Sequence, residues 1–380
     1  MNASIVNEAK TMKIILKVIL ALVLVLAAGI YFYSQRPEFG RTPTGKRLAR
    51  IQQSPHYYNG RFWSIVPVEK PVETSQFQAT MRFLFGKTPE RLVPAEPMVS
   101  RKTDLRKLDL QQDMVVWMGH STFYLQLAGN RILIDPVFSE WASPLPFINK
   151  VFAGSNVYTA EDIPDIDLLV ISHDHWDHLD YPTLMALKPK IKKIVVPLGI
   201  GEHFEYWGFD LDKITEEDWY TPVKLSEQLT VHILPAQHFT GRFLNANQSE
   251  ACAFAFITPQ CKVFYSGDGG YTKEFKEFGN TFGGFDLAIL ENGQYNKDWP
   301  KIHMNPKETA QAGEDLKAKT VLPCHGGKFA MARHPWDEPY IRLAEESKTK
   351  PYRLLTPRIG EAAVIGDSNE TFGPWWKEMK

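Results

Sequence analysis

Four metal-binding side chains lie within six residues, directly after the apolar stretch 168–172. They are His173, His175, Asp177 and His178. Side chains in an extended segment alternate between two faces, so His173 and His175 can converge on one ion. The turn that follows can direct Asp177 and His178 towards a second ion. The spacing therefore predicts a site for two metal ions.

Three further candidate ligands, His238, Asp268 and His325, each follow a short apolar run that predicts a strand. Several strand ends can deliver ligands to one edge of a sheet, which is how such sites are usually built. A cluster of solvated loop residues is the alternative interpretation. The predicted strands are 231–234, 263–265 and 320–322.

These residues and their flanking motifs resemble the metallo-β-lactamase superfamily, in which an H-x-H-x-D-H run is completed by a later His, a bridging Asp and a final His. The resemblance extends from about residue 114 to about residue 361. It is strongest for the branch that contains N-acylphosphatidylethanolamine-hydrolysing phospholipase D and lactonase-type hydrolases. The matching motifs are WMGHST at 117–122, LIDPVF at 133–138, ASP at 142–144, IPDID at 163–167, LDY at 179–181, PLG at 197–199, PAQH at 235–238 and GFD at 284–286.

The resemblance implies a fold, a cofactor and a ligand assignment. The fold is an α/β sandwich of the αββα type over residues 114–370, with two mixed β-sheets flanked by helices. The cofactor is a pair of zinc ions that hold a bridging hydroxide, the nucleophile of the family; iron or manganese can occupy similar sites. The implied ligands are His173, His175 and His238 for one ion, Asp177, His178 and His325 for the other, and Asp268 as the bridge.

His303 is the best remaining candidate for substrate chemistry, and Asp177 and His303 are the expected catalytic residues. His303 precedes a helix start in which Asn305 is the cap, Pro306 the first helical residue and Glu308 the closing residue of a capping box. A His at this place could bind a phosphoryl oxygen or protonate a leaving group. The family has a His there too. The alternative is a helix-entry His bonded to backbone.

Two segments depart from the phospholipase D pattern. The stretch Glu291–Tyr295 replaces a Pro-Ile-Gly segment, and Gly327 follows His325-Gly where the family has His-Trp-Gly. Both should border the pocket, so Tyr295 is an expected substrate contact. A carboxylate near the pocket could repel a phosphate, which favours an alternative substrate class.

The loop 138–147 places apolar residues, including Trp141 and Phe147, in a stretch too irregular for a helix or a strand. Such residues either plug the core or form an exposed apolar patch. In the second case the loop borders the active-site mouth, and Trp141 and Phe147 contact acyl chains or the bilayer surface. His120, between two predicted strands, is a weaker catalytic candidate because a turn His bonded to backbone would look the same.

The N-terminal residues 14–33 form an apolar run long enough to cross a bilayer. We expect an uncleaved transmembrane anchor, with a signal sequence as the alternative. The catalytic domain would then be anchored to a membrane, and we expect this to be the bacterial inner membrane. The basic residues on the two sides of the apolar run are nearly balanced, so they do not decide which side the domain lies on. The remaining boundaries are a tail at 1–13, an extended segment wrapping the core at 34–113 and a tail at 371–380.

Composition excludes some partners. The formal net charge is −1 over 380 residues, which counts against a nucleic-acid enzyme because phosphate backbones need a basic face. The three cysteines do not imply a disulfide framework, although Cys252 and Cys261 sit in neighbouring strand-like segments and could pair. A homodimer remains open.

The regular elements follow the order of the implied fold. Strands are predicted at 115–117, 123–127, 131–134, 193–196 and 287–290, with Gly129-Asn130 as a hairpin turn, and helices at 181–187, 306–316 and 336–346. The leading functional hypothesis is zinc-dependent, phospholipase D-type hydrolysis of N-acylphosphatidylethanolamine or a related lipid. The alternatives are a lactonase or amide hydrolase on a soluble small molecule, and a metal-binding scaffold without catalysis.

Overall fold

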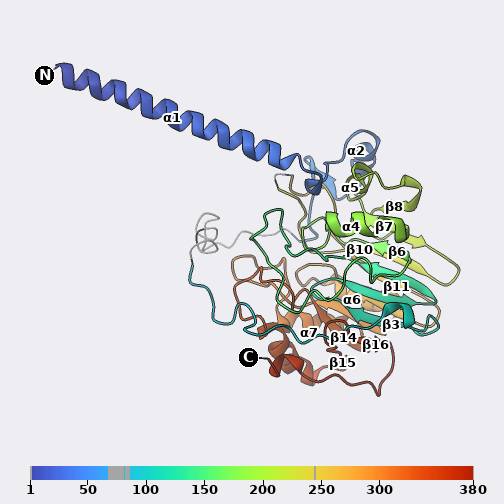
Figure 1. Ribbon diagram of the computed structural model, residues 1–380. Coiled ribbons are helices and arrows are strands. Elements are labelled where there is room, and N and C mark those ends of the chain that lie inside the picture. Colours follow the sequence, from blue (N-terminus) through green and yellow to red (C-terminus); the bar gives the residue numbers. More distant parts are fainter. Residues whose placement is uncertain (1, 67–80, 82–85, 244, 380) are drawn as a thin grey trace.

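The computed structural model describes residues 2–66, 81, 86–243 and 245–379, and its centre is a sandwich of two seven-stranded mixed sheets (Figure 1). The first sheet has the order β16-β3-β4-β5-β6-β7-β8, antiparallel as far as β5 and parallel beyond it. Its strands are β3 Met114–Trp117, β4 Phe123–Leu127, β5 Asn130–Ile134, β6 Ile166–Val170, β7 Ile191–Pro197, β8 Ile214–Glu217 and β16 Ala362–Val364.

The second sheet has the order β15-β14-β13-β12-β11-β10-β9, antiparallel from β9 to β12 and parallel from β12 to β15. Each sheet therefore has one half whose strands run in the same direction and end at the same edge. The strands are β9 Pro222–Lys224, β10 Thr230–Pro235, β11 Cys252–Ile257, β12 Lys262–Tyr265, β13 Leu287–Glu291, β14 Thr320–Cys324 and β15 Arg353–Leu354.

Strand alternation divides the apolar residues among three layers of core. In β3, Val115 and Trp117 face the second sheet, whereas Val116 packs on the outer face under helices. The outer face of the first sheet is covered by α4 Tyr181–Leu187 and α5 Gly201–Tyr206, and that of the second by α6 Glu274–Phe282 and α7 Pro306–Asp315. The predicted αββα metallo-β-lactamase sandwich is thus confirmed. The remaining helices of the domain are α8 Glu338–Glu346 and the short 3-10 turns Leu105–Lys107, Lys188–Lys190, Leu211–Lys213, Ser347–Thr349 and Trp375–Lys377.

The N-terminal helix α1, Asn2–Ser34, is continuous and projects away from the sandwich (Figure 1). Within its segment Lys10–Ser34, a window of 18 residues has a mean hydropathy of 2.7 and none of its residues is buried. By length and composition the segment therefore fits a membrane span or a signal sequence. Beyond it lie the 3-10 turn Pro37–Phe39, α2 Gly45–Ile51 and the hairpin β1 Tyr57–Tyr58 with β2 Arg61–Phe62. The predicted wrapping segment 34–113 falls in part on residues 67–80 and 82–85, which are outside the described residues.

One local prediction was wrong, and one pairing that the sequence left open does not occur. The hairpin turn is Ala128-Gly129, with φ of 47° and 75°, and Asn130 already pairs with Leu127 as the first residue of β5. The Asn130 side chain instead donates to the carbonyls of Leu127 and Ala128 and so stabilises the turn. Cys252 and Cys261 are both free thiols, because the β11–β12 register places them at opposite ends of the ladder.

Candidate metal centre

Loops that follow strands bring the seven predicted ligands to one edge of the sandwich. The run His173–His178 follows β6, and His238 follows β10. Asp268 follows β12, and His325 comes directly after β14 with a left-handed φ of 62°. All of them are buried except His175, which is half-buried. The strand ends therefore bring the candidate ligands together at one edge, as the sequence predicted.

The first group of ligands is His173, His175 and His238, whose candidate ligand atoms all lie within 4.8 Å of one another. Nε2 of His173 is 2.9 Å from Nδ1 of His175, and the same Nδ1 is 3.2 Å from Nε2 of His238. Three imidazole nitrogens facing one point are a suitable donor set for a divalent transition metal.

The second group is Asp177, His178 and His325, which His120 joins. Oδ2 of Asp177 lies 3.4 Å from Nε2 of His178 and 3.9 Å from Nδ1 of His325. Nε2 of His120 is 2.8 Å from the same carboxylate oxygen. His120 is fully buried, so its position suits orientation of Asp177.

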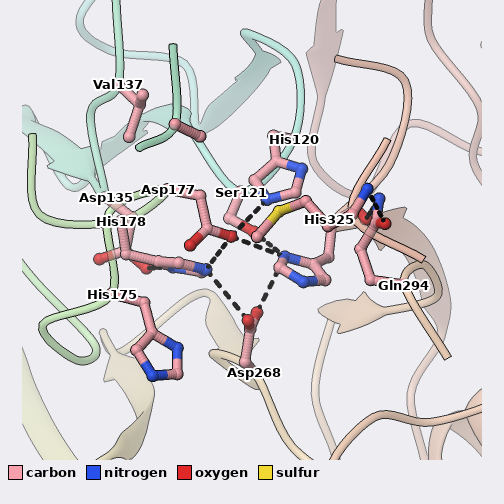
Figure 2. A network of polar contacts seen from close by, with 12 residues as sticks. His120, Ser121, Asp135, Val137, His175, Asp177, His178, Asp268, Gln294 and His325 are labelled. Atoms are coloured by element: carbon pink, nitrogen blue, oxygen red, sulfur yellow. Dashed lines mark hydrogen bonds and ion pairs between the residues drawn. The ribbon is translucent and has the colours of Figure 1, made fainter. Parts of the chain in front are cut away.

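Asp268 contacts both groups, and Figure 2 shows its carboxylate between the rings of His178 and His325. Its Oδ2 is 3.1 Å from Nε2 of His178, 3.8 Å from Nε2 of His173 and 3.9 Å from Nε2 of His238. Its Oδ1 is 3.0 Å from Nδ1 of His325. One carboxylate thus reaches both ligand groups, as a bridge between two ions would.

The buried polar atoms of this cluster fit a bound cation. Nε2 of His325 is buried without a hydrogen-bond partner among the described residues, and Nε2 of His178 and Oδ1 of Asp268 make only ion-pair contacts, at 3.0 to 3.4 Å. Leaving such groups without hydrogen bonds is costly in a folded protein. A metal ion would satisfy them, and the donors are nitrogen and oxygen atoms without a thiolate.

Electrostatics prepares most of the histidines for metal binding. Burial and the neighbouring histidines hold the pKa values of His173, His238 and His325 well below the usual range, and burial lowers that of His175 to about 4. These rings are therefore neutral at physiological pH, the form that binds metal. His178 is the exception: burial lowers its pKa, but the carboxylates around it outweigh burial and raise it well above the usual range.

Asp135 is a supporting residue that sequence reasoning did not single out. It follows β5, and its Oδ2 accepts from Nδ1 of His178 at 2.7 Å, from the hydroxyl of Ser172 at 2.6 Å and from that of Tyr265 at 2.6 Å. A carboxylate behind a histidine ligand fixes its ring and its tautomer. The only signal in the sequence was an Asp at a strand end within the LIDPVF motif.

Arg242 is a second residue that was missed. Its guanidinium is buried, donates to the carbonyls of Asp174, Leu179 and Glu38, and stacks at 3.8 Å on Trp176. It thus ties the ligand loop to the segment that follows α1.

His303 lies beside the ligands, as predicted. Its ring stacks on His325 with centroids 5.2 Å apart and meets the ring of His238 edge-on at 5.0 Å. The capping box of Asn305 and Glu308 is present, and α7 begins at Pro306, three residues after His303. The backbone alternative does not apply, because Nδ1 of His303 contacts the carboxylate of Glu291.

The predicted substrate contacts occupy different surroundings. Tyr295 stacks on His334 and donates to Glu338 on α8 at 2.8 Å. Trp141 lines a cavity of about 170 Å³ together with Trp176, next to the segment after α1. Phe147, in the same loop as Trp141, is 71% exposed. Trp141 and Phe147 therefore belong to one surface region, whereas Tyr295 packs against α8.

Comparison with known proteins agrees with the fold and the cluster. Residues 130–326 match the model of the β-lactamase superfamily domain. An uncharacterised protein of Mycobacterium tuberculosis is 35% identical over 331 residues, which is 86% of this chain and 88% of the relative. N-acyl-phosphatidylethanolamine-hydrolyzing phospholipase D 1 of Caenorhabditis elegans is 34% identical over 269 residues, 66% of this chain and 75% of the relative.

Among solved structures, a metallo hydrolase of Ignicoccus hospitalis aligns with a TM-score of 0.52 at 19% identity, over 69% of this chain and all of that one. At this identity the likeness shows the fold alone. The family match covers half of the chain and includes all seven candidate ligands, which follow the strands β6, β10, β12 and β14. The chain therefore belongs to the metallo-β-lactamase superfamily and is a metal-dependent hydrolase related to the N-acylphosphatidylethanolamine-hydrolysing phospholipases D.

Proposed function

We propose that this protein is a dinuclear zinc phosphodiesterase of the phospholipase D type, which hydrolyses N-acylphosphatidylethanolamine or a related lipid. The observation that supports it most is Asp268, whose carboxylate lies within 3.9 Å of His173 and His238 in the first group and of His178 and His325 in the second. The His303 ring is stacked beside them. Two bound zinc ions would supply Lewis acidity and a water nucleophile at neutral pH.

The protein's own residues supply orientation and charge. His173, His175 and His238 would hold one ion, and Asp177, His178 and His325 the other, with Asp268 shared. His303, whose Nδ1 is engaged by Glu291, would in its protonated form donate from Nε2 to a phosphoryl oxygen or to the leaving oxygen. Hydrolysis would join water oxygen to phosphorus and release phosphatidic acid and an alcohol.

The region around α1 supports a lipid substrate. The hydroxyl of Tyr33, at the end of α1, donates to the carbonyl of Pro144 at 2.6 Å, so the helix ends against the loop 138–147. Phe39 packs on Trp176, which lies within the ligand run. A bilayer that holds α1 would therefore meet the protein next to Trp141 and Phe147, on the side of the metal-ligand loop. We place the protein in the bacterial inner membrane by this anchor.

The alternative is hydrolysis of a soluble lactone or amide, and it relied on a carboxylate near the pocket as a charge that repels phosphate. The carboxylate of Glu291 is fully buried and contacts Nδ1 of His303, so its charge is engaged by this ring.

The proposal is tested with purified, zinc-loaded protein in mixed micelles of N-acylphosphatidylethanolamine. Release of phosphatidic acid, abolished in His175→Ala, is the expected result. Turnover of a panel of lactones without turnover of the lipid or of bis-p-nitrophenyl phosphate would overturn the substrate class and keep the hydrolase.

A further inference from the structure

Glu291 is a buried carboxylate that the metal-ligand set does not use. It ends β13 and is 0% exposed. Its Oε2 accepts from the backbone N–H of Gly269 at 2.6 Å, and its Oε1 contacts Nδ1 of His303. Gly269 directly follows Asp268, so one side chain joins the loop of the bridging carboxylate to the histidine beside it.

These two contacts fix which nitrogen of His303 is available. With Nδ1 held by Glu291, only Nε2 remains for a bound substrate. The ring is further restrained by its parallel stacking on His325 and its edge contact with His238. A ligand atom of His303 also lies within 4.8 Å of those of His238 and Asp268, so the ring belongs to the immediate surroundings of the cluster.

We propose that Glu291 is the positioning residue of His303: its carboxylate keeps a proton on Nδ1 and directs Nε2 to the substrate. The inference rests on the proposed function in one respect, the action of His303 on substrate. Carboxylates that hold a catalytic or metal-bound histidine by its second nitrogen do the same work in other sites.

The contacts of Glu291 make the variant Glu291→Gln decisive. The N–H of Gly269 needs an acceptor, so the amide oxygen must face Gly269 and the amide NH₂ must face His303. Nδ1 of His303 then becomes an acceptor, so the ring is held in the neutral form with its one proton on Nε2. The substitution therefore removes the carboxylate that stabilises the protonated, donating ring, with almost no change in side-chain volume.

The experiment measures the protonation of His303 in zinc-loaded protein labelled with ¹⁵N-histidine, with His303→Gln used to assign its signals. We expect Nδ1 to carry a proton in the wild type and to lose it in Glu291→Gln. Glu250→Gln is the matched control, because Glu250 is also a buried glutamate, at 1% exposure, and lies outside the ligand groups. A proton that stays on Nδ1 in Glu291→Gln would overturn the inference.

Turnover of bis-p-nitrophenyl phosphate gives the second readout. We expect Glu291→Gln to lower kcat roughly 10- to 100-fold with zinc content and KM unchanged, and the double variant with His303→Gln to be no slower than His303→Gln alone. Three results would overturn the positioning role. They are a double variant whose kcat falls by the product of the two single losses, a lower zinc content in Glu291→Gln, and a loss of kcat in Glu250→Gln equal to that in Glu291→Gln. Unchanged turnover in His303→Gln would instead remove His303 from the proposed function. The proton on Nδ1, measured by ¹⁵N NMR, would still show whether Glu291 holds the His303 ring.

Discussion

Nδ1 of His178 lies 2.7 Å from Oδ2 of Asp135, and this contact connects the end of β5 to the metal-ligand run after β6. β5 and β6 are parallel neighbours, so both residues leave the sheet at the same edge. Asp135 also accepts from Ser172 and Tyr265, so the carboxylate is held in place from three sides. The ligand geometry thus depends on a carboxylate that touches no other predicted ligand.

Replacement of Asp135 tests this support. Asp135→Asn removes the charge behind His178 and should weaken zinc binding roughly 10- to 100-fold, because such partners set ligand orientation and basicity. Competition with a chelator of known affinity measures the change. Asp113→Asn is the control, since Asp113 accepts from the backbone of Ala128 in a turn. Equal zinc affinity in Asp135→Asn and the wild type would show that the contact is only structural.

Removal of a ligand should have a larger effect. We expect His175→Ala and Asp177→Ala each to abolish hydrolysis and to lower bound zinc, because each opens a coordination shell. Metal analysis alongside turnover measures both. Full activity with two zinc ions retained in either variant would contradict the ligand assignment.

The pH dependence of stability reports the burial of the ligands. In the metal-free protein burial lowers the pKa of His175 from 6.5 to about 4, so between these values the unfolded chain binds a proton that the folded chain does not. His175 therefore contributes a loss of unfolding free energy as pH falls through this window. His175→Gln should make the loss between pH 6.5 and 4 smaller, as measured by urea unfolding of chelator-treated protein. Identical slopes in the two proteins would refute the prediction.

The exposed loop beside α1 gives a test of lipid access. Trp141→Ala with Phe147→Ala should reduce turnover of long-chain lipid far more than turnover of bis-p-nitrophenyl phosphate, because the loop would contact acyl chains or the bilayer surface. Ile341→Ala, which removes an exposed apolar side chain on α8, serves as the control. Equal losses on both substrates, or a large fall in Tm, would assign the loop to core packing.

The features predicted from the sequence are those that depend on the spacing of residues close together in the chain. The ligand run occupies six consecutive residues, and the other ligands follow apolar runs that become strands, so pattern and periodicity were sufficient. The same holds for the capping box that places His303 before α7.

Contacts between distant segments could not be predicted from the sequence. Glu291 contacts His303, and Arg242 donates to carbonyls of the ligand loop and of the segment after α1. These contacts depend on how the folded sheets align the segments. The sequence placed the segment 291–295 at the border of the pocket, but it could not show that Glu291 contacts His303. The turn at Ala128 was misplaced by one residue because Asn130 stabilises it from the strand.

In the proposed dinuclear centre, two metal ions share Asp268. Anomalous diffraction at the zinc absorption edge, from crystals of zinc-loaded protein, tests it most directly. We predict two peaks, one among His173, His175 and His238 and one among Asp177, His178 and His325, with Asp268 in contact with both. A single peak, or peaks away from these residues, would contradict the dinuclear centre.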